Sequence, residues 1–202
     1  PGMVTSAVAT DFNADGNEDL VIVGEWMPVS FFENRAGEFV NVSEQYGLNN
    51  TTGWWFSIIA DDFDKDGDED LVMGNLGLNY KYQASEEETF DIYAYDYDDN
   101  EKLDIVLSYF NEGTQYPVRG RECSSQQIPA LANKFKSYTS FAKATLNDVY
   151  TPSALDAAVH YQARTFSSVY IENKGNGKVE VNPLPGEAQL SNINDMVSGD
   201  FN

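Results

Sequence analysis

The chain of 202 residues has only one cysteine, Cys123, and only one histidine, His160. A single cysteine excludes a disulfide within the chain, and a single histidine argues against a histidine-built transition-metal centre. No apolar run reaches the roughly 18–20 residues that a membrane-spanning helix needs. No signal peptide is present, so we expect any export signal to have been removed or to lie outside this sequence.

Basic side chains are also scarce, since 12 of them stand against 33 acidic ones and leave a net charge of −21. This charge argues against a partner made of nucleic acid and against adsorption to an anionic membrane. Hydrophobic residues make up 42% of the chain and aromatic residues 13%, which is enough to build a core. We therefore expect a folded, acidic protein.

The acidic residues are concentrated in three short segments, 11–19, 61–70 and 96–104, which hold 16 of the 33. Residues 11–21, 62–72 and 96–106 align with one another without gaps, and 199–202 begins what looks like a fourth copy. Oxygen-bearing side chains recur at positions 1, 3, 5 and 9, and position 7 can offer its backbone carbonyl, which is how a short loop surrounds calcium. The predicted calcium ligands are Asp11, Asn13, Asp15, Asn17 and Asp19 in the first loop, Asp62, Asp64, Asp66, Asp68 and Asp70 in the second, and Asp96, Asp98, Asn100, Lys102 and Asp104 in the third.

Clusters of Asp, Asn and Gly are also typical of ordinary turns, but three aligned copies favour metal loops. Gly16 and Gly67 at position 6 permit the positive φ of a sharp turn. Glu101 takes that place in the third loop, so we expect the third loop to bind calcium more loosely than the other two.

Apolar, β-prone stretches precede and follow each loop, which predicts hairpins whose turns are the loops. A strand is also expected at Met196-Val197, before the fourth copy. Residues 29–42 and 168–181 each read as a strand, an Asn/Gly turn and a second strand. One metal hairpin plus one Asn/Gly hairpin makes four strands, the size of a propeller blade. The sequence therefore predicts an all-β fold of three blades and the beginning of a fourth.

These loops resemble FG-GAP/VCBS repeats, which form the blades of integrin-α-like β-propellers. The segments 74–79, 116–121, 127–129, 168–170, 184–185 and 188–189 are similar to bacterial proteins related to the ASPIC/UnbV group, frequent in Bacteroidetes. The resemblance implies Ca²⁺ as the bound ion and a propeller fold, but no settled biochemical activity.

A helical insertion is expected at 122–164, between blade residues 1–121 and a return to the blade at 165–202. Apolar residues from Leu131 to Leu146, Tyr138 among them, recur at helical spacing, and Thr151-Pro152 is typical of a helix start that continues through Tyr161. Arg119 and Arg121 either pair with nearby carboxylates or grip a carboxylate or sulfate of a ligand.

Catalytic residues are not expected, because neither Cys123 nor His160 has an evident partner. Trp26 is a candidate sugar-binding residue, although aromatic side chains more often fill the space between blades. We expect a non-catalytic, calcium-stabilised binding or adhesion scaffold that acts outside the cell, at the cell surface or in the periplasm. A glycan-binding module and a non-catalytic part of a larger propeller enzyme are the alternatives. The expected partner is a protein or glycan, and self-association or further blades would cover the open sheet edges.

Overall fold

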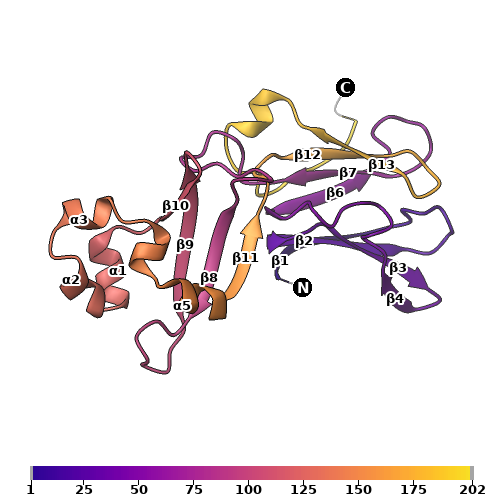
Figure 1. Cartoon of the computed structure of the whole chain (residues 1–202). Helices are drawn as coiled ribbons and strands as arrows, with labels where there is room; N and C mark the ends of the chain where they lie inside the picture. The colour runs from indigo at the N-terminus through magenta and orange to yellow at the C-terminus, as the bar shows by residue number, and fades with distance from the viewer. Residues whose placement is uncertain (1, 201–202) are drawn as a thin grey trace. The chain divides into compact units, whose positions relative to one another are not determined.

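The computed structural model describes residues 2–200 and divides the chain into two compact units. Unit 1 combines Pro1–Lys81 with Ala163–Asn202, and unit 2 is formed by Tyr82–Gln162. Unit 2 is therefore inserted into the sequence of unit 1. The elements of each unit are labelled in Figure 1.

The first sheet of unit 1 is a meander of four consecutive antiparallel strands in the order β1-β2-β3-β4. A short fifth strand pairs with β2. The bounds are β1 (Met3–Thr10), β2 (Asp19–Met27), β3 (Ser30–Arg35), β4 (Glu38–Asn41) and β5 (Gly53–Trp54). The first acidic loop joins β1 to β2, and the Asn/Gly turn joins β3 to β4, as the sequence predicts.

The second sheet of unit 1 has the order β13-β12-β7-β6 and brings together two hairpins that are far apart in the sequence. Val169 pairs with Met73 and Ile171 with Leu71, while unit 2 lies between them in the chain. The strands are β6 (Ser57–Asp61), β7 (Asp70–Gly74), β12 (Val169–Asn173) and β13 (Val179–Pro183), and the 3-10 helix η1 (Gly186–Gln189) follows. Each predicted blade of unit 1 thus consists of one metal hairpin and one Asn/Gly hairpin.

The core of unit 1 draws on both sheets, because alternate residues of the central strands point to one face. Val21, Val23, Leu71 and Ile171 are completely buried, and Trp55 is 1% exposed. Burial of this kind stabilises the fold by about 25 cal/mol for each Å² of apolar surface removed from water.

Unit 2 has its own four-stranded sheet, in the order β10-β9-β8-β11, and its own core. Its strands are β8 (Phe90–Tyr95), β9 (Asp104–Asn111), β10 (Thr114–Pro117) and β11 (Val159–Ala163). Five short helices lie between β10 and β11 along the chain: α1 (Arg121–Gln127), α2 (Ala130–Lys134), α3 (Tyr138–Ala142), α4 (Leu146–Val149) and α5 (Pro152–Ala157). Leu131, Phe135, Phe141 and Leu146 of the helical segment belong to the same buried cluster as Tyr93 and Val106 of the sheet.

Unit 2 begins at Tyr82 and includes the third loop, so the helical insertion expected at 122–164 forms part of a larger compact unit. The prediction that the last helix continues through Tyr161 is wrong. Helix α5 ends at Ala157, and the strand β11 begins at Val159 and lies beside β8. Tyr138, expected on the buried helical face, is 64% exposed.

The sheet-rich fold is confirmed, but residues 2–200 do not close a propeller. Met196 and Val197 form no strand. Residues 201–202 of the fourth predicted loop lie outside the described residues, and Figure 1 draws them as a grey trace. No helix within 2–200 is both long and apolar enough to cross a bilayer.

We expect Ile171→Ala to lower the free energy of unfolding by about 2–5 kcal/mol, because it leaves a cavity where β12 packs in the core of unit 1. Urea unfolding followed by tryptophan fluorescence measures the change. Val181→Ala is the control, because Val181 is 43% exposed on the neighbouring strand β13. Equal losses in the two variants would contradict the burial of Ile171 in the core of unit 1.

Candidate functional site

The three acidic loops share one hydrogen-bond pattern at their first position. The Asp11 carboxylate accepts the backbone N–H groups of Asp15 and Gly16 at 3.0 and 2.9 Å. Asp62 and Asp96 each accept the two equivalent N–H groups of their own loops. The first carboxylate therefore holds the turn, since backbone donors aimed at one anion fix the chain around it.

The fifth position braces the second half of each loop. Asp15 Oδ1 accepts the N–H of Asn17 at 2.8 Å, and Asn100 Oδ1 accepts the N–H of Lys102 at 2.9 Å. The matching bond in the second loop runs from the N–H of Asp68 to Asp66 Oδ1 at 3.2 Å.

The backbone turns left-handed twice in every loop, at positions 4 and 6. The φ values are 58°, 64° and 58° at Ala14, Lys65 and Asp99, and 89°, 105° and 65° at Gly16, Gly67 and Glu101. Glu101 thus adopts the left-handed conformation at a cost of about 1–2 kcal/mol, and the third loop keeps the turn that the glycines give the other two.

Three carboxylates converge in the second loop and three in the third. One oxygen from each of Asp62, Asp64 and Asp70 lies within 4.8 Å of the others, and Asp96, Asp98 and Asp104 repeat this arrangement. Ligand oxygens on opposite sides of one calcium ion, at 2.3–2.6 Å each, are about 4.6–5.2 Å apart, so the spacing fits this ion. The first loop has Asn13 at the corresponding third position, which supplies an amide oxygen instead of a third carboxylate.

The third loop contains a buried carboxylate oxygen that accepts no hydrogen bond in the described structure. Asp98 Oδ1 is buried and has no hydrogen-bond partner among residues 2–200. An unpaired carboxylate oxygen away from water is costly unless a cation balances it. This buried oxygen favours a cation in the third loop, while the looser binding expected from the strain at Glu101 stays a prediction.

Hydrogen bonds and loss of water contact shift the pKa values of the acidic groups in the second loop in different directions. The hydrogen bond to Asp66 raises the pKa of Asp68, and loss of water contact raises the pKa of Asp64. The N–H of Asp68 lowers the pKa of Asp66 in turn. Carboxyl groups gathered this closely in one loop are the environment that a divalent cation neutralises.

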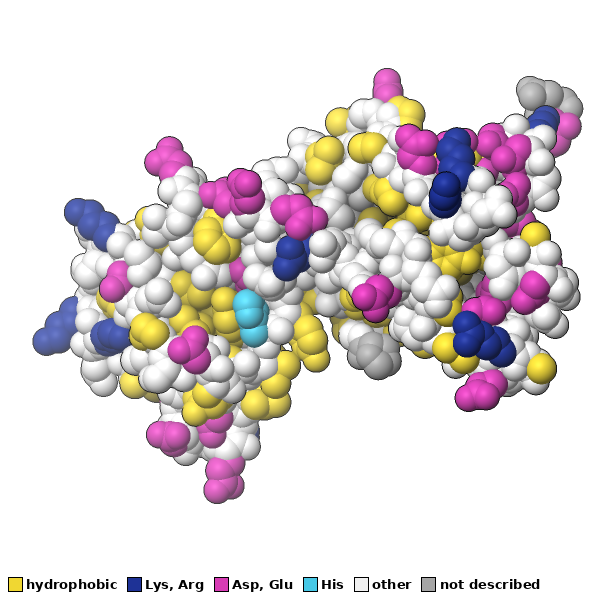
Figure 2. Space-filling view, turned by 45° about the vertical axis from the view of Figure 1, so that its right-hand side comes forward, with side chains coloured by type: hydrophobic (Ala, Val, Ile, Leu, Met, Phe, Trp, Pro, Cys, Tyr) yellow, Lys and Arg dark blue, Asp and Glu magenta, His cyan; other side chains and the backbone are white. Residues whose placement is uncertain are grey.

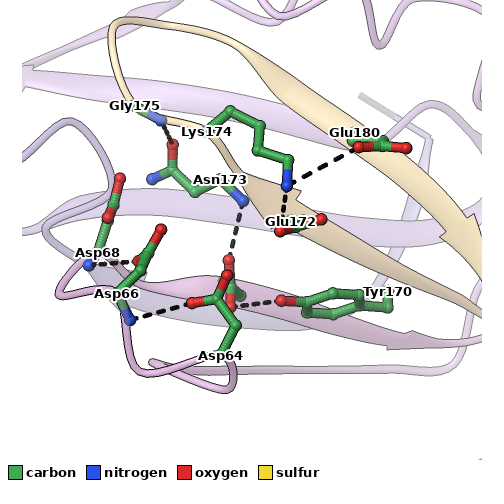
Figure 3. A network of polar contacts seen from close by, with 10 residues as sticks. Asp64, Asp66, Asp68, Tyr170, Glu172, Asn173, Lys174, Gly175 and Glu180 are labelled. Atoms are coloured by element: carbon green, nitrogen blue, oxygen red, sulfur yellow. Dashed lines mark hydrogen bonds and ion pairs between the residues drawn. The ribbon is translucent and has the colours of Figure 1, made fainter.

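The ninth carboxylate connects the metal hairpin to the next hairpin of the sheet, whose Tyr170 and Asn173 are labelled in Figure 3. Asp70 is completely buried; its Oδ1 accepts the N–H of Asn173 at 2.8 Å and its Oδ2 the hydroxyl of Tyr170 at 2.6 Å. The Asn173 amide nitrogen donates to the carbonyl oxygens of Phe12 and Glu69 at 2.8 and 3.3 Å. One asparagine side chain therefore joins both acidic loops of unit 1.

Asn34 has the equivalent role in the first sheet. Its N–H donates to Asp19 Oδ1 at 2.8 Å, and its amide nitrogen donates to the carbonyl oxygen of Glu18 at 3.0 Å. Asn34 and Asn173 were not predicted as site residues, although both occur as Glu-Asn at the same place in the two Asn/Gly hairpins. That repeated pair was the available signal.

The third loop lacks such an asparagine contact in the described structure. Asp104 is 5% exposed, and its Oδ2 accepts the N–H of Tyr97 from the same loop at 3.0 Å. The ninth carboxylate of unit 2 therefore closes its own loop and does not join two hairpins.

Trp26 lies at a bulge of β2, where its φ is 51° and the register with β5 shifts. Its ring packs on that of Trp54, with centroids 4.6 Å apart. The two rings are half-buried. The structure thus places Trp26 near the end of β2, in an aromatic pair with Trp54 of β5.

The expected pairing of Arg119 and Arg121 with carboxylates is wrong. Arg121 donates to the carbonyl oxygens of Phe135 and Ala132, and Arg119 donates to Gln127 Oε1 at 2.6 Å. Neither arginine forms an ion pair with a carboxylate of residues 2–200.

His160 has a partner that the sequence did not reveal. Its Nε2 lies 3.2 Å from Oδ1 of Asp91, which is 1% exposed, and its ring stacks on Tyr93 at a centroid distance of 4.1 Å. Gln115 donates to Asp91 Oδ2 at 2.6 Å and Thr89 to Oδ1 at 2.9 Å. These contacts satisfy a buried carboxylate, which favours a structural role for His160.

Comparison with known proteins supports the repeat. Residues 11–73 match the family model of the FG-GAP-like repeat, which covers the first two loops and about a third of the chain. No curated protein and no solved structure matches the chain.

We expect Asn173→Ala to lower the free energy of unfolding by about 2–3 kcal/mol, because the acceptors Phe12 O and Glu69 O lose a buried donor. Chemical unfolding measures this change. Asn50→Ala, at an exposed loop position, is the control and should change the free energy by less than about 0.5 kcal/mol. A loss no larger than that of the control would show that the asparagine does not join the loops.

We expect Asp98→Asn and Asp64→Asn to weaken calcium binding at one site each by about tenfold or more, because each removes a full ligand charge. Isothermal titration calorimetry resolves the lost site. Asp99→Asn removes the same charge from an exposed neighbour in the third loop and should leave binding nearly unchanged. If Asp98→Asn behaves like Asp99→Asn, the third loop is not a calcium site.

Proposed function

We propose that this chain is a calcium-stabilised, non-catalytic binding scaffold built from FG-GAP-type blades. The convergence of three carboxylates at equivalent positions of two loops carries the proposal. Calcium would be held by positions 1, 3, 5 and 9 and by the position 7 carbonyl of each loop, where it would supply positive charge to side chains that otherwise repel one another.

A structural role for the ion follows from what the loops connect. The second loop joins β6 to β7, and through Asp70 and Asn173 it also meets β12. An ion that draws Asp62, Asp64 and Asp70 together would therefore stabilise the turn and the junction between two hairpins. We assign the ion to folding stability and not to a reaction.

The proposed location is outside the cell, at the cell surface or in the periplasm. Extracellular calcium modules bind with dissociation constants of about 10⁻⁴–10⁻³ M, which suits compartments with millimolar calcium and not the bacterial cytosol. The match to the FG-GAP-like repeat supports this placement, because such repeats are typical of extracellular and surface domains. We also propose a relationship to bacterial proteins of the ASPIC/UnbV type.

The non-catalytic assignment rests on the two groups that the sequence singled out. Cys123 is exposed, and His160 is engaged by Asp91 and by Tyr93. A thiol nucleophile needs a base within hydrogen-bond reach, and the ring of His160 is committed to a buried carboxylate.

Glycan binding is the second candidate function. It is favoured by a pocket of unit 2 in which tyrosine rings and two arginine side chains meet. We expect the partner to be a protein or a glycan, with further blades or a second copy of the chain completing the open sheets.

We expect chelation of calcium to lower the melting temperature by about 5–11 °C and added calcium to restore it. One site at a hundredfold excess of ligand adds about 2.7 kcal/mol, and each kcal/mol shifts the midpoint of a domain of this size by about 2–4 °C. Differential scanning calorimetry with chelator, with calcium and with magnesium measures the shift. Identical melting curves with and without chelator would refute the structural role of calcium.

A further inference from the structure

The helical part of unit 2 has the opposite charge to the rest of the chain. Residues 119–143 contain five of the 12 basic side chains and a single acidic one, Glu122, in a protein whose net charge is −21. The five are Arg119, Arg121, Lys134, Lys136 and Lys143. Figure 2 shows how widely acidic side chains are spread over one face of the molecule by comparison. This segment, which we call the basic segment, attracts anions locally.

A pocket of ≈ 300 Å³ opens at the basic segment and combines cationic with aromatic side chains. Its walls include Arg119, Arg121, Tyr109, Tyr116, Tyr138 and Phe141, all within unit 2. Three of the four rings are tyrosines, which offer an apolar face and a polar hydroxyl at the same time. A ligand for these walls needs a ring-shaped body and a negative group.

The two arginines are held in place but are not neutralised. Two carbonyl oxygens accept from Nε and Nη2 of Arg121, whose guanidinium also lies 5.5 Å from the centre of the Tyr138 ring. Gln127 accepts from one terminal nitrogen of Arg119. Glu122 accepts the Tyr138 hydroxyl at 3.4 Å and pairs with neither arginine.

An arginine is charged at every physiological pH, and its fork of N–H groups matches the oxygens of a carboxylate or a sulfate. The described contacts leave donors on both guanidinium groups for such an anion. Fixing each arginine in advance reduces the side-chain entropy that binding would otherwise cost.

We propose that this pocket binds an acidic sugar residue, with its carboxylate or sulfate on Arg119 and Arg121 and its pyranose ring against the tyrosines. This inference rests on the binding role proposed above, but it does not depend on calcium in the loops.

Other anionic ligands fit less well. A volume of ≈ 300 Å³ is at the lower limit for ligand pockets and suits one ring, not a folded partner. Nucleic acid carries a charge on every phosphate and would be repelled by the acidic remainder of the chain. An inorganic anion would make no use of the four aromatic rings.

The test is an NMR titration of the full chain with three methyl galactosides that differ only at carbon 6, which carries a hydroxyl, a carboxylate or a sulfate. We expect shifts of the backbone signals of residues 109–144 with the carboxylate or the sulfate form and none with the hydroxyl form. Comparison of the two acidic forms shows whether the pocket binds a carboxylate or a sulfate. Equal responses to all three sugars, or no response to either acidic form, would overturn the proposal.

Variants then test the assigned residues. Arg119→Gln should weaken binding of the responding sugar by about tenfold, because one charge-assisted contact is lost. Tyr138→Ala, at an exposed position, should also weaken it. Lys178→Gln removes one positive charge from an exposed position in unit 1 and should leave binding unchanged. Equal affinities of Arg119→Gln and Lys178→Gln would refute the site.

The outcome is separable from that of the calcium proposal. The melting experiment with chelator contains no sugar, and the titration is carried out at one fixed calcium concentration. Loss of the melting shift would remove the role of calcium and leave the sugar site standing. Absence of sugar binding would remove the site and leave the calcium scaffold standing.

Discussion

Repulsion among carboxylates confined to short turns is the constraint on which this structure depends. In each metal hairpin the turn between two strands is also the place where acidic side chains converge, as at Asp62, Asp64 and Asp70. Backbone N–H groups bind the first carboxylate of every loop, which gives partial relief. A bound cation would neutralise the charge that is left over. The conformation that satisfies the backbone of these loops is thus also the one that gathers their charges.

The ninth aspartate extends this local constraint to the sheet. Asp19 and Asp70 each accept the N–H of an asparagine on the third strand of their blade, Asn34 or Asn173. Each asparagine also donates from its side chain to the neighbouring carbonyl of the loop, and each accepts an N–H from the turn that follows it. The metal loop and the Asn/Gly turn are therefore fixed by the same residue. Unit 2 uses the loop without this connection, since Asp104 binds Tyr97 within the loop itself.

The local parts of this architecture could be predicted from the sequence, and the long-range parts could not. Repeated spacing identified the loops, the hairpins on either side and the Asn/Gly turns, because these depend on residues that are close together in the chain. The pairing of β7 with β12 joins Leu71 to Ile171, and no periodicity in the sequence encodes that partnership. The residues of β11 were predicted as helix because the strand is short and follows α5 almost directly, so its alternating pattern is hard to recognise. At Glu101 a non-glycine residue adopts the left-handed turn that glycine gives the other two loops, because the surrounding hydrogen bonds fix it. The partner of His160 was hidden because Asp91 lies on a strand far away in the sequence.

The insertion of unit 2 between β7 and β12 has a consequence for synthesis on the ribosome. The hairpin of β6 and β7 emerges early, yet its neighbour β12 follows only after all of Tyr82–Gln162 has been made. At a rate of synthesis of about 5–20 residues per second, the edge of β7 that later pairs with β12 stays unpaired for several seconds. During that interval its backbone donors and acceptors are open to other chains. A unit 2 that folds promptly brings the two ends of the interruption together and shortens this period of exposure.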